Sequence, residues 1–394
     1  MPSVLLSRGP RVSLPLANTH HQRHRGVACH ASNPPPASCG LGAPQLLEEC
    51  GDADWRSSLT NPSSADDDEP SSSTSTSSSS FPVVALGKFD AMHRGHRSLA
   101  AAAAQMKPLG GGGENANSPL LLPPQPWLLS FSGMAEVLGW EPRRPLVAPC
   151  DRARVLGSWA TACGGTAPRQ RIVPFAAVRS MEPEEFVEAL TNPREGLGAR
   201  GVVVGEGHRF GKNASGDTRL LTELCERRGV SVRVVNLVRS FTKDVDGVGD
   251  CGGDIVSSSA VRDALAAGRV AAAAALLGRR YRLVALIPAA DWQIALSSCS
   301  SSSGGSSSSL VIPDAAFLNQ PPRGGQAYSA AATVAPAEAR PVGASGVVDL
   351  RDVDVVFGSD SVSGSFAEIF LPPGSQWPRL PGDGTGDVRL TLDF

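Results

Sequence analysis

A short apolar run that leads into a turn rich in glycine and histidine constrains the fold of this chain more than any other feature. Residues 81–86 are apolar, residues 87–96 read Gly-Lys-Phe-Asp-Ala-Met-His-Arg-Gly-His, and residues 98–106 are rich in alanine. The apolar run indicates a buried strand, and alanine is the strongest helix former. The turn therefore connects a strand to the start of a helix, where backbone N–H groups converge on bound anions.

Two histidines of this turn suit phosphate chemistry. His93 and His96 are three residues apart at the predicted helix start, so both imidazoles lie on one side of it. They can donate hydrogen bonds to oxygens that gain charge during displacement at phosphorus. Gly87 and Gly95 leave the backbone open to a polyphosphate. The alternatives are a surface or helix-capping role for each histidine, or a zinc site. Zinc fits poorly because no third ligand stands nearby and the sequence has no CxxC pair.

Strand-like and helix-like runs alternate from residue 81 to residue 282, which predicts an α/β domain with a parallel sheet. The expected strands are 83–86, 127–131, 171–174, 201–204 and 231–237. The expected helices are 98–106, 151–163, 183–190, 217–228, 259–267 and 270–277. Residues 109–126 are rich in glycine and proline and predict an insertion before the second strand.

The rest of the chain differs in composition from this domain. Residues 1–47 contain arginine but no aspartate or glutamate, which is typical of an organelle transit peptide; a disordered tail is the alternative. Residues 48–80 predict a disordered linker rich in serine and aspartate. Residues 283–394 predict a small β remnant, with a serine-rich spacer at 297–309. Its candidate strands are 346–357, 366–371 and 388–394.

Composition argues against several classes of partner. The formal net charge of −2 argues against nucleic acid as the main partner. No apolar run approaches the roughly 18 residues of a membrane span. The eight cysteines are scattered without metal-site or disulfide-scaffold spacing, which favours a reduced compartment.

A second motif runs from an apolar strand into a glycine-rich loop at residues 201–217. Ligands of open α/β folds bind beyond the carboxyl ends of such strands. Arg209 or Lys212 can neutralise a phosphate there, and Asp217 can cap the following helix. The loop is not a P-loop, because its glycines are one residue too far apart and Asn213 stands where Ser or Thr would bind magnesium.

A third motif places three hydroxyls before a helix at residues 255–265, with Arg262 one turn into that helix. Ser258 or Ser259 can cap the helix and still reach a phosphate, while Arg262 supplies positive charge. Capping alone is the alternative. The other two motifs, at the ends of other strands, favour the phosphate interpretation.

Together the three motifs resemble those of the FAD synthetases, which are related to the adenylyltransferase module of bacterial bifunctional riboflavin kinase/FAD synthetases. The resemblance covers residues 81–282, about half of the chain, and Leu-Leu-Gly-Arg at 276–279 matches the end of the family's domain. The segments 130–140 and 150–159 look like the plastid members. The resemblance implies a Rossmann-like nucleotidyltransferase fold and a place in the chloroplast, in the stroma.

The implied reaction is FMN plus MgATP giving FAD and pyrophosphate, with Mg²⁺ entering with ATP and no metal ligand from the protein. ATP and FMN are the expected partners, and neither nucleic acid nor a membrane is an expected partner. By resemblance, the catalytic residues are His93, His96 and Arg262. Those that bind ATP are Gly87, Lys88, Phe89, Asp90, Gly95, Gly205, Ser258 and Ser259. Those that bind FMN are Ser130, Phe131, Ser132, Gly133, His208 and Arg209.

The chain departs from the family pattern at three positions. Ala91 replaces a glycine, which requires a negative φ at this residue. Ser259 replaces a threonine and keeps the hydroxyl. Gly207 stands where the family has a ligand-binding asparagine, with His208 where an aromatic residue is usual.

The riboflavin kinase module of the bifunctional relatives would follow Tyr281 and carry Pro-Thr-Ala-Asn, which occurs nowhere in this chain. We therefore expect no kinase activity. Two other functions stay open: a related nucleotidyltransferase acting on another phosphorylated acceptor, and a catalytically impaired protein that binds flavin nucleotides.

Overall fold

The computed structural model describes residues 47–50, 55–59, 80–107, 123–240, 255–299, 309–338, 347–360, 364–372, 375–378 and 386–394. The chain divides into two compact units. The larger unit holds Leu46–Leu283, Leu318–Arg323 and Asp393–Phe394, and the smaller unit holds the described parts of 284–317 and 324–392. The predicted transit peptide lies outside the described residues except for Leu47, and so does most of the predicted insertion at 109–126.

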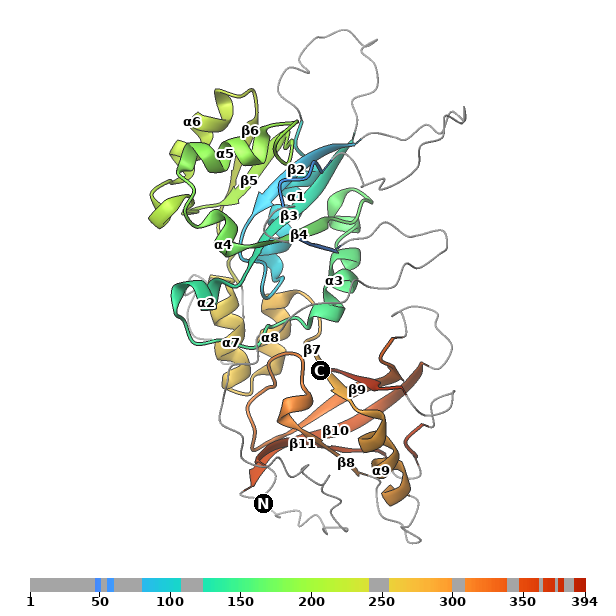
Figure 1. The fold of residues 1–394 in the computed structure, drawn as a ribbon. Coiled ribbons are helices and arrows are strands. Elements are labelled where there is room, and N and C mark those ends of the chain that lie inside the picture. The colour runs from blue at the N-terminus through green and yellow to red at the C-terminus, as the bar shows by residue number, and fades with distance from the viewer. Residues whose placement is uncertain are drawn as a thin grey trace, which may run out of the picture. The chain divides into compact units, whose positions relative to one another are not determined.

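The larger unit is built on a six-stranded sheet in which each neighbouring pair of strands is parallel. Its strands are β1 (Leu47–Glu49), β2 (Phe81–Leu86), β3 (Pro124–Ser132), β4 (Arg169–Pro174), β5 (Gly201–Gly205) and β6 (Ser231–Val235). Their order in the sheet is β1-β4-β3-β2-β5-β6. This arrangement confirms the predicted α/β class, and every strand expected between residues 81 and 282 is present (Figure 1).

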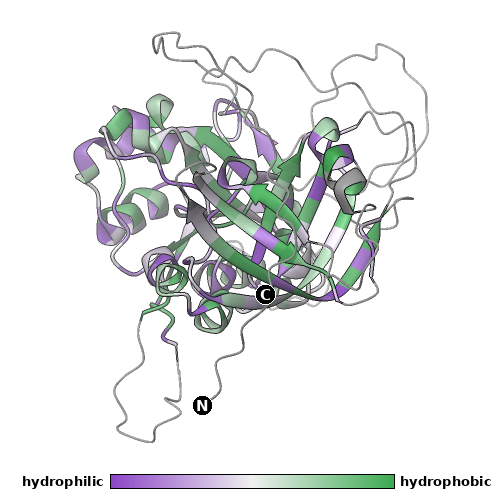
Figure 2. Cartoon of the chain, turned by 90° about the horizontal axis from the view of Figure 1, so that it is seen from below, coloured by the Kyte–Doolittle hydropathy of each residue, from purple (hydrophilic) through white to green (hydrophobic). Residues whose placement is uncertain are grey.

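Both faces of this sheet are covered. Successive residues of a strand point to opposite sides, so a strand that is buried throughout contributes to a hydrophobic cluster on each face. Val83 and Ala85 of β2 join a hydrophobic cluster with residues of α1 (Arg94–Ala104) and α3 (Arg152–Ser158). Val84 and Leu86 join a second cluster on the other face. That cluster includes residues of α5 (Pro183–Thr191) and α6 (Thr218–Glu226). Several strands are coloured as hydrophobic in Figure 2.

The remaining helices of the larger unit are short. They are α2 (Met134–Leu138), α4 (Phe175–Val178), α7 (Ser258–Ala266), α8 (Val270–Leu277) and the 3-10 turns η1 (Pro149–Asp151), η2 (Thr161–Cys163) and η3 (Lys212–Ala214). The expected single helix at 151–163 is thus wrong in its continuity, because η1, α3 and η2 divide it. The final turn ends at Gly164, whose φ of 70° is left-handed and stops a helix.

Part of the predicted linker at 48–80 folds with the larger unit instead. β1 pairs with β4, and Trp55 and Leu59 are buried in the second cluster. Glu48 forms ion pairs with Arg169 at 2.8 Å and with Arg171 at 2.7 Å. The described residues 48–50 and 55–59 are thus held by contacts with residues distant in sequence.

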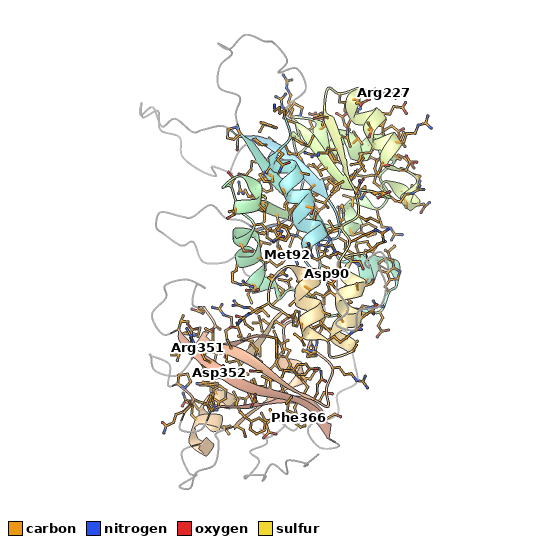
Figure 3. The ribbon with its side chains drawn as sticks, turned by 180° about the vertical axis from the view of Figure 1, so that it is seen from behind. Asp90, Met92, Arg227, Arg351, Asp352 and Phe366 are labelled. Carbon is orange, nitrogen blue, oxygen red and sulfur yellow. The ribbon has the colours of Figure 1, made fainter. Side chains whose placement is uncertain are left out.

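The smaller unit is built on a second six-stranded sheet, in the order β7-β12-β9-β10-β11-β8. Its elements are β7 (Arg282–Ile287), α9 (Ala289–Cys299), β8 (Ser309–Pro313), η4 (Asp314–Ala316), β9 (Ala327–Pro336), β10 (Val348–Asp360), β11 (Gly364–Phe370) and β12 (Val388–Asp393). The three strands expected here correspond to β10, β11 and β12. β10 contains a bulge, and Asp352, which lies there, has a φ of 58° (Figure 3).

No helix among the described residues is long and apolar enough to cross a membrane.

Candidate active site

The sheet order brings the predicted motifs to one edge of the larger unit. From β2 the chain builds the sheet outward through β3 and β4 on one side, and through β5 and β6 on the other. In open α/β sheets ligands bind where the strand order reverses, beyond the carboxyl ends of the strands. The turn at 87–96 follows β2, the loop at 205–217 follows β5, and Ser130–Gly133 lie at the end of β3. This edge is therefore the candidate site.

The two histidines of the turn are locked together at the start of α1. His93 is the N-cap, and its Nδ1 accepts a hydrogen bond from the backbone N–H of His96 at 3.3 Å. The Nδ1 of His96 accepts in return from the backbone N–H of His93 at 3.4 Å. The rings are stacked, with centroids 3.6 Å apart and planes at 14°. Because each Nδ1 is an acceptor, each neutral ring carries its proton on Nε2. The Nε2–H group of each ring can therefore donate a hydrogen bond to a ligand.

Both histidines stay neutral over the physiological pH range. Burial, followed by the positive charge of Arg279, lowers the pKa of His93 from 6.5 to about 4. Burial, with His93, Arg152 and Arg279, lowers the pKa of His96 well below 6.5. The site thus holds neutral donors, which stabilise a developing negative charge without themselves having to be protonated.

This burial predicts a loss of stability in acid. Between pH 6.5 and pH 4 the unfolded chain binds a proton at His93 that the folded chain does not, so the free energy of unfolding falls as the pH falls. His93 alone contributes up to about 3 kcal/mol to this fall. His208, whose pKa burial also lowers to about 4, acts in the same direction. Urea unfolding across this pH range measures the fall in the free energy of unfolding. His208→Gln should make the dependence of this free energy on pH shallower, and an unchanged dependence would contradict the lowered pKa of His208.

Three arginines surround the turn, and two of them hold its carbonyl oxygens. Arg152 Nη2 donates to the Phe89 carbonyl at 2.7 Å, and its Nε donates to the Gln170 side chain. Arg279 donates to the Ala91 carbonyl at 3.0 Å and to the Met92 carbonyl at 2.6 Å. Burial lowers the pKa of Arg279 to about 10, so it remains charged at neutral pH. This concentration of positive charge suits a polyphosphate.

The third arginine, Arg262, is paired with Asp90. Its Nη2 lies 2.7 Å from Asp90 Oδ2, while Asp90 Oδ1 accepts from the backbone N–H of Leu146 at 3.2 Å. The structure therefore brings the predicted catalytic arginine of α7 to the turn after β2. Asp90 lies beside the start of α1 in Figure 3.

The backbone of the turn is strained at Met92 and relaxed at Ala91. Ala91 has no positive φ, so the backbone at this position is open to alanine. Met92 has a φ of 49° and is fully buried, and Arg279 holds its carbonyl. A non-glycine residue in this conformation costs about 1–3 kcal/mol, and such strain gathers at functional sites.

The remaining residues of the turn shape its interior. Phe89 is fully buried and lies edge-on to the His96 ring, with centroids 5.0 Å apart. Gly87 faces the Phe89 ring, where an added Cβ would lie 3.1 Å from the nearest ring atom. Lys88 is exposed, and its ammonium group lies 5.2 Å from the centre of the Trp140 ring.

The expected cap of α7 is wrong by one or two residues. Ser257, not Ser258 or Ser259, is the N-cap, and its hydroxyl accepts from the Ala260 N–H at 3.1 Å. The side chains of Ser258 and Ser259 make no hydrogen bond to the described residues. Both hydroxyls are therefore available to a ligand at the helix start.

The two basic side chains predicted in the loop after β5 bond within that loop or to the preceding helix start. Arg209 is exposed and donates to the Ala214 carbonyl at 3.0 Å, and Lys212 pairs with Glu182. Asp217 caps α6, as expected. Gly207 has a left-handed φ of 75°, a conformation that glycine and asparagine both adopt.

The predicted flavin side at the end of β3 is partly buried. Ser130 is buried and Phe131 packs edge-on against Phe175, whereas Ser132 and Gly133 are exposed. Gly133 has a φ of 68° and begins α2. These residues neighbour the turn through the pairing of β3 with β2.

Sequence reasoning missed the roles of Arg152 and Arg279. Arg152 lies in the segment 150–159 and Arg279 in the segment 276–279. Both segments resemble those of FAD synthetases, but no role was predicted for either arginine. Arg152 stands before an apolar helical run and is buried, so its charge requires partners. An arginine directly before such a run was the available signal.

The described residues contain no group of three His, Cys, Asp or Glu side chains placed to bind a metal.

Comparison with known proteins finds similarity to FAD synthetases. Residues 171–246 match the family model of FAD synthetase. The chain is 45% identical over 214 residues to FAD synthetase 2, chloroplastic, of Arabidopsis thaliana and 46% identical over 208 residues to FAD synthetase 1, chloroplastic, of the same plant. These alignments cover 53% and 51% of this chain.

A bacterial relative and a solved structure are more distant. The bifunctional riboflavin kinase/FMN adenylyltransferase of Pseudomonas fluorescens is 29% identical over 205 residues, which cover 51% of this chain. The chain spans about half the length of these curated FAD synthetase relatives: 52%, 53% and 55%. A crystal structure of a macrolide-efflux protein from Streptococcus pneumoniae shares the fold, with a TM-score of 0.51, 18% identity and coverage of 80% of this chain and 85% of that one.

Proposed function

We propose that this chain is an FMN adenylyltransferase that forms FAD and pyrophosphate from FMN and MgATP. The observation that carries the proposal is the histidine pair, held neutral and in one tautomer among buried arginines, where the strand order of the sheet reverses. Such a site suits displacement at phosphorus. The similarity to FAD synthetases and to a bifunctional riboflavin kinase/FMN adenylyltransferase supports FMN as the acceptor.

The reaction requires positioning and charge stabilisation but no covalent intermediate. A phosphate oxygen of FMN forms a bond to the α-phosphorus of ATP, and the bond from that phosphorus to the oxygen bridging to the β-phosphate breaks. The electron pair leaves with pyrophosphate. The Nε2–H groups of His93 and His96 donate to the oxygens that gain charge, while Arg262, Ser258 and Ser259 hold the β and γ phosphates.

The other residues shape the two substrate pockets. Gly87, Lys88, Phe89, Asp90, Gly95 and Gly205 border the nucleotide in this proposal. The flavin is bordered by Ser130, Phe131, Ser132, Gly133, His208 and Arg209. Mg²⁺ enters with the ATP phosphates, whose charge it partly neutralises.

We propose that the chain acts in the chloroplast, in the stroma, since the two plant relatives are chloroplastic and residues 1–47 have a transit-like composition. We also propose that it has no riboflavin kinase activity, because Pro-Thr-Ala-Asn is absent from its sequence.

Turnover of the full chain with MgATP, given FMN or riboflavin, tests these proposals. FAD from FMN and no product from riboflavin is the expected result. FMN from riboflavin would overturn the proposal on kinase activity. Flavin binding without product would instead identify a binding protein, and turnover of another phosphorylated acceptor in preference to FMN would identify a different nucleotidyltransferase.

Gly95→Ala should reduce turnover by about tenfold or more, because small displacements of a catalytic group are costly. The added Cβ would lie 3.1 Å from Cε1 and 3.2 Å from Nδ1 of His93. Helix propensity favours alanine by up to about 1 kcal/mol, so the loss should not come from unfolding. Steady-state kinetics measures it, with Gly157→Ala as the matched control, since Gly157 is an exposed glycine of α3 and no heavy atom lies within 4 Å of its added Cβ. Equal activity of the two variants would contradict this role of His93.

A further inference from the structure

The six residues Leu318–Arg323 fold with the larger unit although they follow it in the sequence. They read Leu-Asn-Gln-Pro-Pro-Arg and belong to none of the three motifs. Two backbone hydrogen bonds attach them: Gln320 N–H donates to the Pro145 carbonyl at 3.0 Å, and Arg323 N–H donates to the Leu265 carbonyl at 2.9 Å. The segment thus spans from the loop before η1 to the end of α7.

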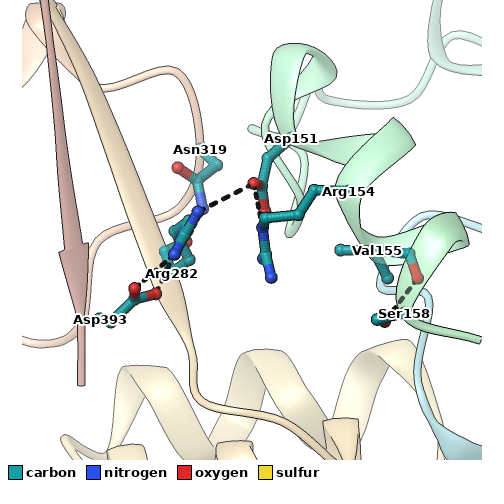
Figure 4. Close-up of polar contacts among 7 residues, drawn as sticks. All are labelled: Asp151, Arg154, Val155, Ser158, Arg282, Asn319 and Asp393. Atoms are coloured by element: carbon teal, nitrogen blue, oxygen red, sulfur yellow. Dashed lines mark hydrogen bonds and ion pairs between the residues drawn. The ribbon is translucent and has the colours of Figure 1, made fainter. Parts of the chain in front are cut away.

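Asn319 anchors this segment. It is fully buried, and the two N–H groups of its Nδ2 are shared among three acceptors, the Arg282 carbonyl at 2.8 Å, the Tyr281 hydroxyl at 3.1 Å and the Leu146 carbonyl at 3.3 Å. The Tyr281 hydroxyl donates onward to the Gln320 carbonyl. Figure 4 shows Asn319 beside Arg282, which also pairs with Asp151 and Asp393. A buried network with its polar groups satisfied gives a rigid support.

Gln320 uses this support to hold Arg262. Its Oε1 accepts from Arg262 Nη1 at 2.9 Å. The other terminal nitrogen, Nη2, donates to Asp90 and to the Arg144 carbonyl at 2.9 Å. A guanidinium group has five N–H donors, so these three bonds fix its plane and leave two donors for a ligand.

We propose that Gln320 is a positioning residue that orients Arg262 toward the β and γ phosphates of ATP, and that Leu318–Arg323 complete the nucleotide site. The inference rests on the proposed function. The energetic reason is that an arginine has many rotamers, and binding a phosphate with an unfixed side chain costs the entropy of ordering it. Gln320 and Asp90 fix the Arg262 side chain when the protein folds, so its entropy is already lost before ATP binds.

The test uses the full chain with Gln320→Ala, and with Gln320→Met, which keeps the length of the side chain and removes the acceptor. The dissociation constant for MgATP, measured by calorimetry, should rise about 2- to 12-fold, the cost of ordering one side chain. The KM for ATP should rise with it, while the KM for FMN and the midpoint of urea unfolding should not change. Gln326→Ala is the matched control, because that amide bonds the Tyr328 hydroxyl within the smaller unit.

A double variant separates positioning from a general structural effect. In the Arg262→Ala background, Gln320→Ala should weaken MgATP binding no further, because the group that it orients is gone. Full additivity of the two losses would overturn the proposal, as would unchanged MgATP affinity in both Gln320 variants. The binding measurement does not depend on product formation. A wild-type chain that binds MgATP but makes no FAD would therefore refute the proposed function and leave this test intact.

Discussion

Replacing His93 with asparagine should lower the rate of FAD formation by about 10²- to 10³-fold while the protein stays folded. Asparagine is a strong N-cap, so its side chain can still accept from the His96 N–H and keep the start of α1. The variant loses the imidazole and its Nε2–H donor. Removal of one donor to a developing oxyanion costs about 2.7–4 kcal/mol in transition-state stabilisation.

The measurement is kcat under saturating FMN and MgATP, with urea unfolding of the same preparation. His93→Ala is the companion variant, because it removes both the donor and the cap and should also lose about 1 kcal/mol of stability. Asparagine and alanine variants with equal kcat and different stability would show that capping and catalysis are separate. Near-normal kcat in His93→Asn would mean that this histidine is only a helix cap.

Truncation of the chain to begin at Ser80 should destabilise it by at least about 5 kcal/mol, which is enough to unfold many domains of marginal stability. The truncation removes Trp55, 2% exposed, and Leu59 from the core of the larger unit. It also removes Glu48 and leaves the buried Arg171 without its carboxylate partner. Loss of a buried Trp side chain and loss of one partner of a buried ion pair each cost about 3–5 kcal/mol.

A protein that begins at Leu46 is the matched control, since it retains Glu48, Trp55 and Leu59. Urea unfolding monitored by circular dichroism compares the two truncated forms. Trp55→Ala in the full chain should show about 3–5 kcal/mol of the same loss. A stable, active protein that begins at Ser80 would contradict the role of this segment.

The parallel sheet could be predicted because its strands are buried on both faces and therefore appear as continuous apolar runs. The turn at 87–96 was recognisable for a related reason. Its glycines and histidines are adjacent in sequence, so the chemistry and its strand-to-helix setting could be inferred together. Asp217 as a helix cap is equally local, and the structure confirms it.

Features that depend on partners distant in sequence were missed or misplaced. β1 is a Leu-Glu-Glu segment of three residues, and only its pairing with β4 and the ion pairs of Glu48 make it a strand. Neighbouring hydroxyls at 257–259 are equivalent in sequence, and the backbone conformation of Ser257 decides which one caps α7.

The sequence by itself determined the fold class, the main strands as they follow one another along the chain, and the turn that carries the histidine pair. Short-range patterns encode all three. Only the tertiary structure decided which charges meet there. Arg152, Arg262 and Arg279 come to this turn from three separate segments, and Gln320 reaches Arg262 from a fourth. Their positions depend on long-range packing, since a buried charge is tolerated only where the fold supplies its partners.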